Sequence, residues 1–243
     1  MVRIENLIKH YGTVRALDGL SLNVEPGVVY GFLGPNGAGK TTTLRILAGL
    51  ARADQGRAWI LDEEIGRSEI DVRPLIGVLP EEPSFYTWMT AREYLRDFVA
   101  PLYGLDARAA GQRAGELLDT VGLVEAADRR IGGYSRGMKQ RLGLAQALIH
   151  RPKVLLLDEH TASLDPKTAA VVMDLTERVV KENALTTLMV THNMEQAIRH
   201  GDRLIMMHEG RIILDVSGEE KSRLTIPEVV ERFGVVDEKL LLV

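Results

Sequence analysis

The chain has 243 residues, in which 30 Lys and Arg stand against 34 Asp and Glu, for a formal net charge of −4. This length suits one well-buried domain, and the acidic balance argues against a nucleic-acid partner, which binds basic surfaces. With no cysteine, no signal-peptide pattern and no apolar run near the roughly 18 residues of a membrane span, we expect a soluble, cytoplasmic chain without disulfides.

The first 50 residues predict strands followed by a helix. Residues 1–30 alternate apolar and polar positions around the turn signals Tyr11-Gly12 and Pro26-Gly27, the pattern of antiparallel strands. "VVYGFLG" (28–34) indicates a buried strand that runs into a glycine-rich loop. "KTTTLRILAGL" (40–50) then has the apolar spacing of a helix.

The middle of the chain predicts helices. The pattern becomes helical from about Ser84 to Asp128, and Thr90-x-x-Glu93 has the form of a capping box. One apolar side of the helix after this box is predicted to contain Tyr94, Leu95, Phe98, Val99 and Leu102. A further helix begins at the N-cap Ser135 and stops before Pro152. Its apolar stripe is predicted to be Met138, Leu142, Ala145 and Ile149.

The last third predicts a parallel sheet. "VLLLDE" (154–159) and "TTLMVTH" (186–192) are continuous apolar runs that end in polar residues, which is typical of strands buried on both faces. Between them Asp165-Pro166 begins a helix with Val172, Leu175 and Val179 on one face. We therefore predict an α/β fold with a mostly parallel sheet, an N-terminal antiparallel β subdomain and a helical insertion at about 84–150. After it, Ile226, Val229, Val230 and Phe233 form a short helical stripe.

The strongest chemical motif is "GPNGAGKT", Gly34 to Thr41, which satisfies G-x-x-x-x-G-K-[ST] between a predicted strand and a predicted helix. Its glycines let several backbone N–H groups face one anion, and the helix start adds a positive dipole end. Lys40 would reach the terminal phosphates, and the Thr41 hydroxyl would bind Mg²⁺. The alternative is a glycine-rich turn that binds nothing. The predicted nucleotide contacts are Gly34, Pro35, Asn36, Gly37, Ala38, Gly39, Lys40, Thr41 and Thr42.

Two carboxylates and a histidine follow neighbouring predicted strands. Asp158 suits a magnesium ion, which prefers oxygen ligands, and Glu159 is placed to orient and polarise a water for attack on a γ-phosphate. His192 ends the next strand, where it would bond the γ-phosphate or the water. Taken alone, the carboxylates also fit a solvated strand end, and the histidine a surface position.

The stretch "GGYSRGMKQRLGLAQAL" (132–148) predicts a second anion-binding helix start, with Ser135 as N-cap and Gly137 beside it. By chain order this helix belongs to the insertion, away from the glycine-rich loop, so its start is expected to face outward. Two copies packed head to tail would let it close over nucleotide held by the other copy. A capped helix without a ligand is the alternative.

Together these motifs resemble the ATP-binding subunit of an ABC transporter over essentially the whole chain. "GPNGAGKT" is similar to the Walker A loop, "VLLLDE" to the Walker B strand, and "YSRGMKQR" (134–141) to the family signature. "SLD" (163–165) is similar to the D-loop, and His192 stands where the switch histidine belongs. Five motifs in this order and spacing make the resemblance specific.

The resemblance implies an ATP hydrolase with a P-loop NTPase core, ATP and Mg²⁺ as cofactors, and catalytic roles for Glu159, His192 and Lys40. It also implies that Ser135 and Gly137 contact the γ-phosphate in trans. Asp165 would help to couple the two sites across a dimer. Tyr11 would stack on adenine, unless it is a cross-strand packing tyrosine.

The resemblance also implies two partners and a location. One partner is a second copy in a head-to-tail dimer, and the other is a transmembrane permease subunit that docks near Phe85–Met89. A small core beneath the helices is the alternative reading of that aromatic segment. The chain would lie peripherally on the inner face of the cell membrane. We expect one ABC-type ATPase domain with a nucleotide-binding core and β subdomain at 1–83 and 151–217, a helical subdomain at 84–150 and a short C-terminal extension at 218–243.

Three residues depart from the family pattern. Glu81 takes the place of a glutamine beside magnesium, and its carboxylate remains a hard oxygen ligand. Arg136 stands where the first glycine of the signature is usual, and His160 replaces the proline after the catalytic glutamate. These changes keep a non-hydrolysing regulatory module open as an alternative, beside a soluble ATPase that acts on DNA or ribosomes.

The two halves of the chain resemble different branches of the family. Residues 1 to about 157 are similar to subunits of export or multidrug-type systems, whereas the rest is similar to an amino-acid-import branch. A natural recombinant, a fusion of two parents and a less familiar subfamily all fit this pattern.

Overall fold

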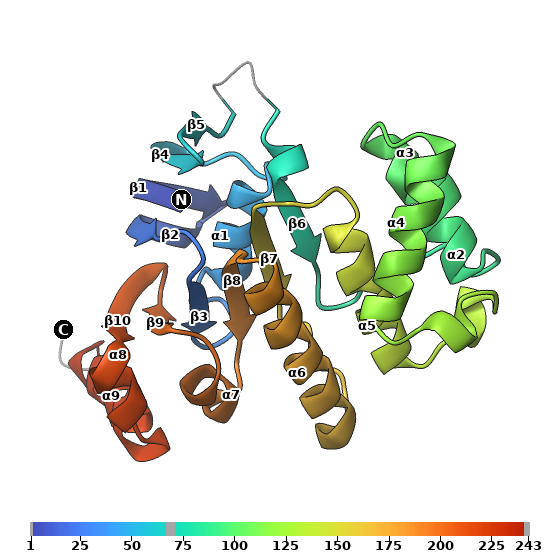
Figure 1. The fold of residues 1–243 in the computed structure, drawn as a ribbon. Coiled ribbons are helices and arrows are strands. Elements are labelled where there is room, and N and C mark those ends of the chain that lie inside the picture. The colour runs from blue at the N-terminus through green and yellow to red at the C-terminus, as the bar shows by residue number, and fades with distance from the viewer. Residues whose placement is uncertain (1, 67–70, 241–243) are drawn as a thin grey trace.

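The computed structural model describes residues 2–66 and 71–240. Residues 241–243, the end of the C-terminal extension predicted at 218–243, lie outside the described residues. The fold consists of two sheets with a helix between them, a group of helices to one side, and further helices against the second sheet (Figure 1). The described part of the chain contains no helix that is long and apolar enough to cross a membrane.

The N-terminal sheet is antiparallel, as the alternating pattern predicts. Its four strands follow the order β2-β1-β4-β5. Val2 pairs with Val24 on one side and with Ile60 on the other, so β1 is an inner strand of the sheet. Their bounds are β1 Val2–Tyr11, β2 Val14–Val24, β4 Gln55–Ile60 and β5 Glu63–Glu64.

The second sheet is mostly parallel, with the order β10-β9-β3-β8-β7-β6. β10 alone runs antiparallel, against β9. The apolar runs form the inner strands because both faces of this sheet are covered. Their bounds are β3 Val29–Leu33, β6 Ile76–Leu79, β7 Val154–Asp158, β8 Thr186–Thr191, β9 Arg203–His208 and β10 Arg211–Ser217. The predicted α/β class and the mostly parallel sheet are confirmed.

Alternate residues of β7 show how the layers form. Val154 and Leu156 pack into the core that α1 (Lys40–Leu47) shares with both sheets. Leu155 and Leu157 enter the core on the opposite face, which α5 and α6 cover. A third core lies near the C-terminus, where α7, α8 and α9 meet β9 and β10. The bounds are α5 Arg136–Leu148, α6 Pro166–Glu182, α7 Met194–Arg199, α8 Gly218–Arg223 and α9 Ile226–Leu240.

The helices between β6 and β7, which we call the helical lobe (91–148), lie to one side of both sheets (Figure 1). Thr90 and Glu93 form the predicted capping box, with both reciprocal bonds present. The longer helical elements are α2 Ala91–Glu93, η2 Tyr94–Val99, α3 Ala100–Leu102 and α4 Ala107–Thr120. Short 3₁₀ turns are η1 Arg73–Leu75, η3 Val124–Ala126 and η4 Ile131–Gly133.

Two predicted apolar stripes are only partly buried. In the lobe, Phe98 and Leu102 are 37% and 70% exposed, although the Phe98 ring stacks on that of Tyr94 with centroids 5.7 Å apart. In α9, Val229 is fully buried against the third core, whereas Ile226 and Val230 are 44% and 50% exposed. Each predicted stripe is therefore buried only in part, and the side chain of Phe233 lies outside the described residues.

Candidate nucleotide-binding site

The loop between β3 and α1 has no room for larger residues at two of its glycines. A Cβ on Gly34 would lie 2.4 Å from the Met207 carbonyl oxygen. Gly39 has a φ of 101°, and a Cβ there would lie 2.5 Å from the Ala16 carbonyl oxygen. The loop is therefore held from behind by β2 and by the end of β9. Its backbone follows a path that only glycine permits at these positions.

Lys40 stands at the centre of this loop. Its side chain is 5% exposed, and Nζ donates to the carbonyl oxygens of Gly34 at 2.7 Å and Pro35 at 3.1 Å. Burial lowers the pKa of Lys40, and the neighbouring carboxylates of Glu159 and Asp158 oppose this shift. A cation surrounded by its own loop and by acidic groups is arranged to meet an anion at the loop opening.

Asp158 and Thr41 meet across the two elements. β7 brings Asp158 to the carboxyl edge of the parallel sheet, where α/β sheets bind ligands. The Thr41 hydroxyl donates to Asp158 Oδ1 at 3.0 Å. Burial raises the pKa of Asp158, and the bond from Thr41 opposes it. A hydroxyl and a carboxylate oxygen are the hard ligands that Mg²⁺ takes, so this pair fits that ion.

The described residues hold no group of three or more His, Cys, Asp and Glu that would bind a metal without further ligands. Mg²⁺ usually keeps several waters and binds through one or two carboxylates together with substrate phosphates. A magnesium site at Asp158 and Thr41 would therefore depend on nucleotide oxygens.

Glu159 joins the lysine to the histidine. Its Oε1 lies 3.6 Å from Lys40 Nζ, and its Oε2 lies 2.8 Å from His192 Nδ1. The Glu159 side chain is 15% exposed, and that of His192 is 54% exposed. The backbone of Glu159 has a φ of 45°, an uncommon conformation for a residue with a side chain. The carboxyl ends of β7 and β8 thus bring together the residues predicted to act on the γ-phosphate.

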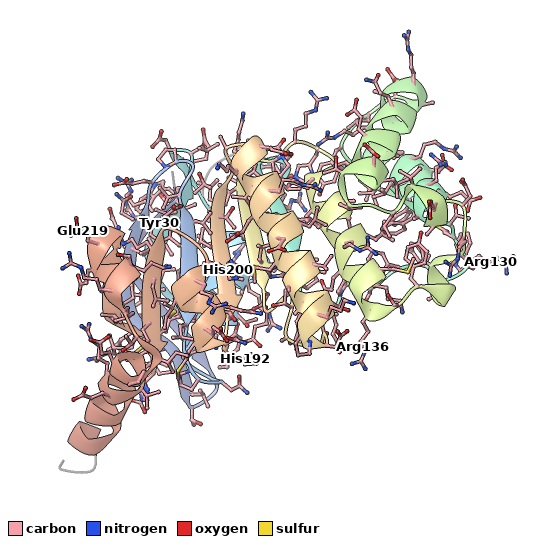
Figure 2. All side chains as sticks on the ribbon, turned by 60° about the horizontal axis from the view of Figure 1, so that its bottom comes forward. Tyr30, Arg130, Arg136, His192, His200 and Glu219 are labelled. Carbon is pink, nitrogen blue, oxygen red and sulfur yellow. The ribbon has the colours of Figure 1, made fainter. Side chains whose placement is uncertain are left out.

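The second helix start lies apart from this cluster. Ser135 Oγ accepts from the Met138 N–H at 3.2 Å, which makes it the predicted N-cap of α5. Gly137 lies against α6, where a Cβ would be 2.3 Å from Thr168 Cγ2. The Arg136 guanidinium donates to the Ser163 carbonyl oxygen at 3.4 Å. Figure 2 shows Arg136 and His192 toward the same edge of the molecule, with Arg130 far out on the helical lobe.

The other predicted residues occupy separate positions. Tyr11 ends β1, is 47% exposed, and has Lys9 Nζ 5.3 Å from its ring centroid. Asp165 is the N-cap of α6, and hydrogen bonds from the Thr168 side chain and from the Thr168 N–H lower the pKa of Asp165. The Glu81 side chain is exposed, and its backbone carbonyl accepts from the Gln140 side chain.

Sequence reasoning missed two glutamines near the site. Gln140 is 3% exposed and ties α5 to the segment after β6 through the Glu81 carbonyl. Gln196 on α7 accepts bonds from two buried threonines. Neither glutamine has a local sequence signal, because each acts on a residue that is distant in the chain.

Residues 17–162 match the family model described as ABC transporter. The uncharacterised ABC transporter ATP-binding protein YxlF of Bacillus subtilis is 46% identical over 212 residues, covering 87% of this chain and 69% of that protein. The daunorubicin resistance ATP-binding protein DrrA2 of Streptomyces coeruleorubidus is 42% identical over 88% of this chain and 66% of its own. The tyrosine transport ATP-binding protein of Clostridioides difficile is 37% identical over 96% and 98% of the two chains.

The similar solved structures are also ATP-binding cassettes of ABC transporters. The ADP conformation of MJ1267, an ATP-binding cassette of an ABC transporter, has a TM-score of 0.84 and 27% identity over 96% of this chain and 98% of that chain. The dimeric post-hydrolysis state of the cassette MJ0796 with ADP and Pi has a TM-score of 0.80 and 27% identity over 89% of this chain and 98% of its own. The chain belongs to the ABC transporter family. Within it the chain is an ATP-binding subunit with the P-loop NTPase fold, and it hydrolyses ATP.

Proposed function

We propose that two copies of this chain close head to tail around two Mg-ATP and that their opening and closing drive a separate membrane subunit. The convergence of Lys40, Asp158, Glu159 and His192 at one edge of the sheet carries this proposal. The dimeric cassette with ADP and Pi among the similar structures supports the assembly. Each site would combine the loop 34–42 of one copy with the Ser135 end of α5 from the other.

Magnesium would be held by Thr41 and Asp158, whose oxygens lie 3.0 Å apart, with Glu81 as a further oxygen ligand. When bound, the ion supplies positive charge against the phosphate oxygens. The exposed Glu81 carboxylate and its backbone bond to Gln140 leave the side chain free to turn toward such a site.

The residues of the cluster would divide the reaction among them. Lys40 binds the terminal phosphates and balances their charge. Glu159 orients the attacking water and accepts its proton as the water oxygen bonds to phosphorus and the bond to ADP breaks. His192 is held at Nδ1 by Glu159, which fixes the ring and leaves Nε2 for the γ-phosphate. The products ADP and phosphate repel each other and no longer bridge the copies, so the dimer opens.

The remaining predicted residues would complete the composite site. Ser135 and Gly137 contact the γ-phosphate of the partner copy, and Asp165 couples the two sites across the dimer. The exposed ring of Tyr11 stacks on adenine. In this proposal the chain is one ABC-type ATPase domain. It has a nucleotide-binding core (1–83 and 151–217), a helical subdomain (84–150) and a C-terminal extension.

The membrane subunit would dock on the aromatic segment Phe85–Met89, which places the chain on the inner face of the cell membrane. Phe85 and Met89 pack into the core of the helical lobe, whereas Tyr86 and Trp88 are 46% and 67% exposed, with ring centroids 5.9 Å apart. The two interpretations of the segment thus apply to different residues. Exposed aromatic side chains over a small core suit a protein contact.

Glu159→Gln is the decisive test, because it removes the proton-accepting carboxylate and keeps its size. We expect phosphate release with Mg-ATP to fall at least about 100-fold, while ATP saturation shifts the mass of the variant from monomer to dimer. Glu182→Gln, the same change at the exposed end of α6, is the matched control and should behave as wild type. Unchanged hydrolysis by Glu159→Gln would remove this residue from its role.

A further inference from the structure

Gln196, in the first turn of α7, joins two buried threonines from different parts of the chain. Its side-chain oxygen Oε1 accepts from Thr161 Oγ1 at 3.1 Å and from Thr191 Oγ1 at 3.4 Å. Both threonines are only 6% exposed. Buried hydroxyls need partners, and here one carbonyl oxygen serves both.

The positions of the threonines connect this contact to the reacting residues. Thr161 lies two residues after Glu159, and Thr191 immediately precedes His192. Glu159 and His192 contact each other at 2.8 Å. Each therefore has a threonine close to it in the chain, and both threonines donate to Gln196 Oε1. Gln196 thus closes a ring that includes both.

The ring is anchored through the cap of α7. Asn193 Oδ1 accepts from the Gln196 N–H at 3.0 Å, which fixes the first turn. The Asn193 N–H donates to Thr191 Oγ1 at 3.0 Å. The Thr191 hydroxyl therefore accepts one bond and donates another, so the end of β8 and the start of α7 form one rigid unit.

The segment that begins at Glu159 needs such support. A side-chain-bearing residue at a φ of 45° persists only where its surroundings determine its conformation. Two backbone bonds help, from the Glu159 N–H to Val190 O at 3.0 Å and from the Ala162 N–H to Glu159 O at 2.9 Å. Neither joins this segment to α7. The side-chain bond between Thr161 and Gln196 does.

Space beside the network would let this segment move if the bond were lost. A pocket of about 470 Å³ lies between α6 and α7. Glu159, Thr161, His192 and Gln196 all contribute to its lining. The position of the Glu159 carboxylate is therefore not fixed by close packing on this side.

We propose that Gln196 is a positioning residue, which holds Glu159 and His192 at the spacing that ATP hydrolysis requires. The inference rests on the roles proposed above for Glu159 and His192. The positioning depends on the acceptor oxygen Oε1 of Gln196, because both threonine hydroxyls donate to this atom. A side chain of similar length that keeps an acceptor should replace it, and one without an acceptor should not.

Two variants separate these cases. Gln196→Leu removes the acceptor at similar size, and we expect kcat for ATP to fall about tenfold or more, since small misplacement of a catalytic group has large effects on rate. KM and the affinity for ATP should stay within about twofold, because Gln196 belongs to α7 and not to the loop 34–42 that is proposed to bind the phosphates. Gln196→Glu keeps acceptor oxygens at this position and should retain kcat within about threefold. Gln112→Leu on the exposed side of α4 is the matched control and should leave kcat unchanged.

Thr161→Val tests the same contact from the other side, because valine has the shape of threonine without the hydroxyl. We expect Thr161→Val to lower kcat as well. The double variant Gln196→Leu/Thr161→Val should be no slower than Gln196→Leu alone, because both substitutions remove the same hydrogen bond. Thermal unfolding of each variant checks that the fold is retained.

Three results would overturn the inference: wild-type kcat in Gln196→Leu, equal losses in Gln196→Leu and Gln196→Glu, or independent effects of Gln196 and Thr161. Glu159→Gln is measured beside these variants. If it hydrolyses ATP normally, the role proposed above for Glu159 fails; if it is inactive while Gln196→Leu is not impaired, only the role of Gln196 fails.

Discussion

Two helices of this protein begin with the residues of an anion-binding site, yet their starts are chemically opposite. α1 follows Gly39, which offers no side-chain cap. α5 follows Ser135, whose hydroxyl already accepts from the Met138 N–H. A helix start without a side-chain cap leaves its first backbone N–H groups for a ligand. A side-chain cap accepts from one of these N–H groups itself. The α1 start therefore has uncapped backbone donors to offer an anion, whereas one donor of the α5 start is already bonded to Ser135.

Their surroundings differ in the same way. At the α1 start Lys40, Asp158 and Glu159 converge from two elements. At the α5 start, Gly137 lies against the α6 residue Thr168, and Arg136 donates to the Ser163 carbonyl oxygen. The cation and carboxylates of the proposed phosphate site thus lie together within a single copy, whereas the Ser135 end of α5 is proposed to act in the site of the partner copy. This difference is what a shared site between two copies requires.

Lys40→Ala should have the largest effect, because it removes the buried cation around which the α1 start is organised. The carbonyl oxygens of Gly34 and Pro35 would also lose their donor. We expect ATP affinity to fall at least about 100-fold and hydrolysis to disappear, as measured by nucleotide titration and phosphate release. Lys167→Ala on the exposed start of α6 should leave both unchanged. Nucleotide binding that survived Lys40→Ala would contradict the view that the α1 start binds nucleotide through this buried cation.

Ser135→Ala tests the weaker end. A lone copy should bind ATP within about twofold of wild type, because this residue lies outside its own phosphate site. Turnover should fall about tenfold or more, since the site of the partner loses a donor. Asp106→Ala removes the N-cap of α4, which accepts from the Ala109 N–H at 2.8 Å, at a similar stability cost of about 1 kcal/mol. Turnover should not change in this control.

Mixing the two variants sharpens the result. A dimer of one Ser135→Ala copy and one Lys40→Ala copy places both defects in one composite site and leaves the other site intact. We expect such mixtures to recover activity that neither variant has alone, up to one site per dimer. Recovery that is absent at every mixing ratio would contradict a site shared between copies.

Gly137 separates two reasons for a glycine at the α5 start. A Cβ there would lie 2.3 Å from Thr168 Cγ2 of the same chain, so Gly137→Ala should push α5 from α6 and lower turnover about threefold to tenfold. Thr168→Ser removes that methyl group, and the double variant should recover most of the turnover, measured by phosphate release. Thr168→Ser alone is the control. A double variant as slow as Gly137→Ala would mean that the partner copy, rather than α6, requires the glycine.

The comparison also explains what the sequence predicts well. The phosphate loop, Asp158 and Glu159 are found because each motif is local, and parallel strands bring their carboxyl ends together without further information. Ser135 is found as a cap for the same reason. Glu81 is different, since its place beside Asp158 follows from the family resemblance alone, and its side chain is exposed in a single copy.

Contacts between distant segments were not predictable. The Gln196 network joins three elements, and the close approach of Gly137 to Thr168 depends on how α5 crosses α6. Residues 94–99 form a π-helical turn, which departs from the 3.6-residue period on which the stripe prediction rests, and the period alone does not show that Phe98 stays 37% exposed. Periodicity describes one element at a time, and these features belong to pairs of elements.

A buried ionisable group also distinguishes the two starts, because His160 directly follows Glu159 behind the α1 site. His160 is 1% exposed, with Nε2 3.4 Å from Thr176 Oγ1. Burial, aided by the nearby His200, lowers the pKa of His160 to about 4 from the ordinary 6.5. Between these values the unfolded chain takes up a proton that the folded chain does not. The stabilisation is therefore complete above about pH 6.5 and is lost as the pH falls toward 4.

His160→Gln, which cannot titrate, should lessen this loss and should have the smallest effect at neutral pH. Between pH 7 and pH 4.5 the wild-type free energy of unfolding should fall on the order of 2 kcal/mol further than that of the variant, measured by urea unfolding at each pH. Asp54, with its pKa lowered to about 2 mainly by its bond from Lys9, loses stabilisation only at lower pH. Parallel curves for wild type and His160→Gln would show that burial does not lower the pKa of His160.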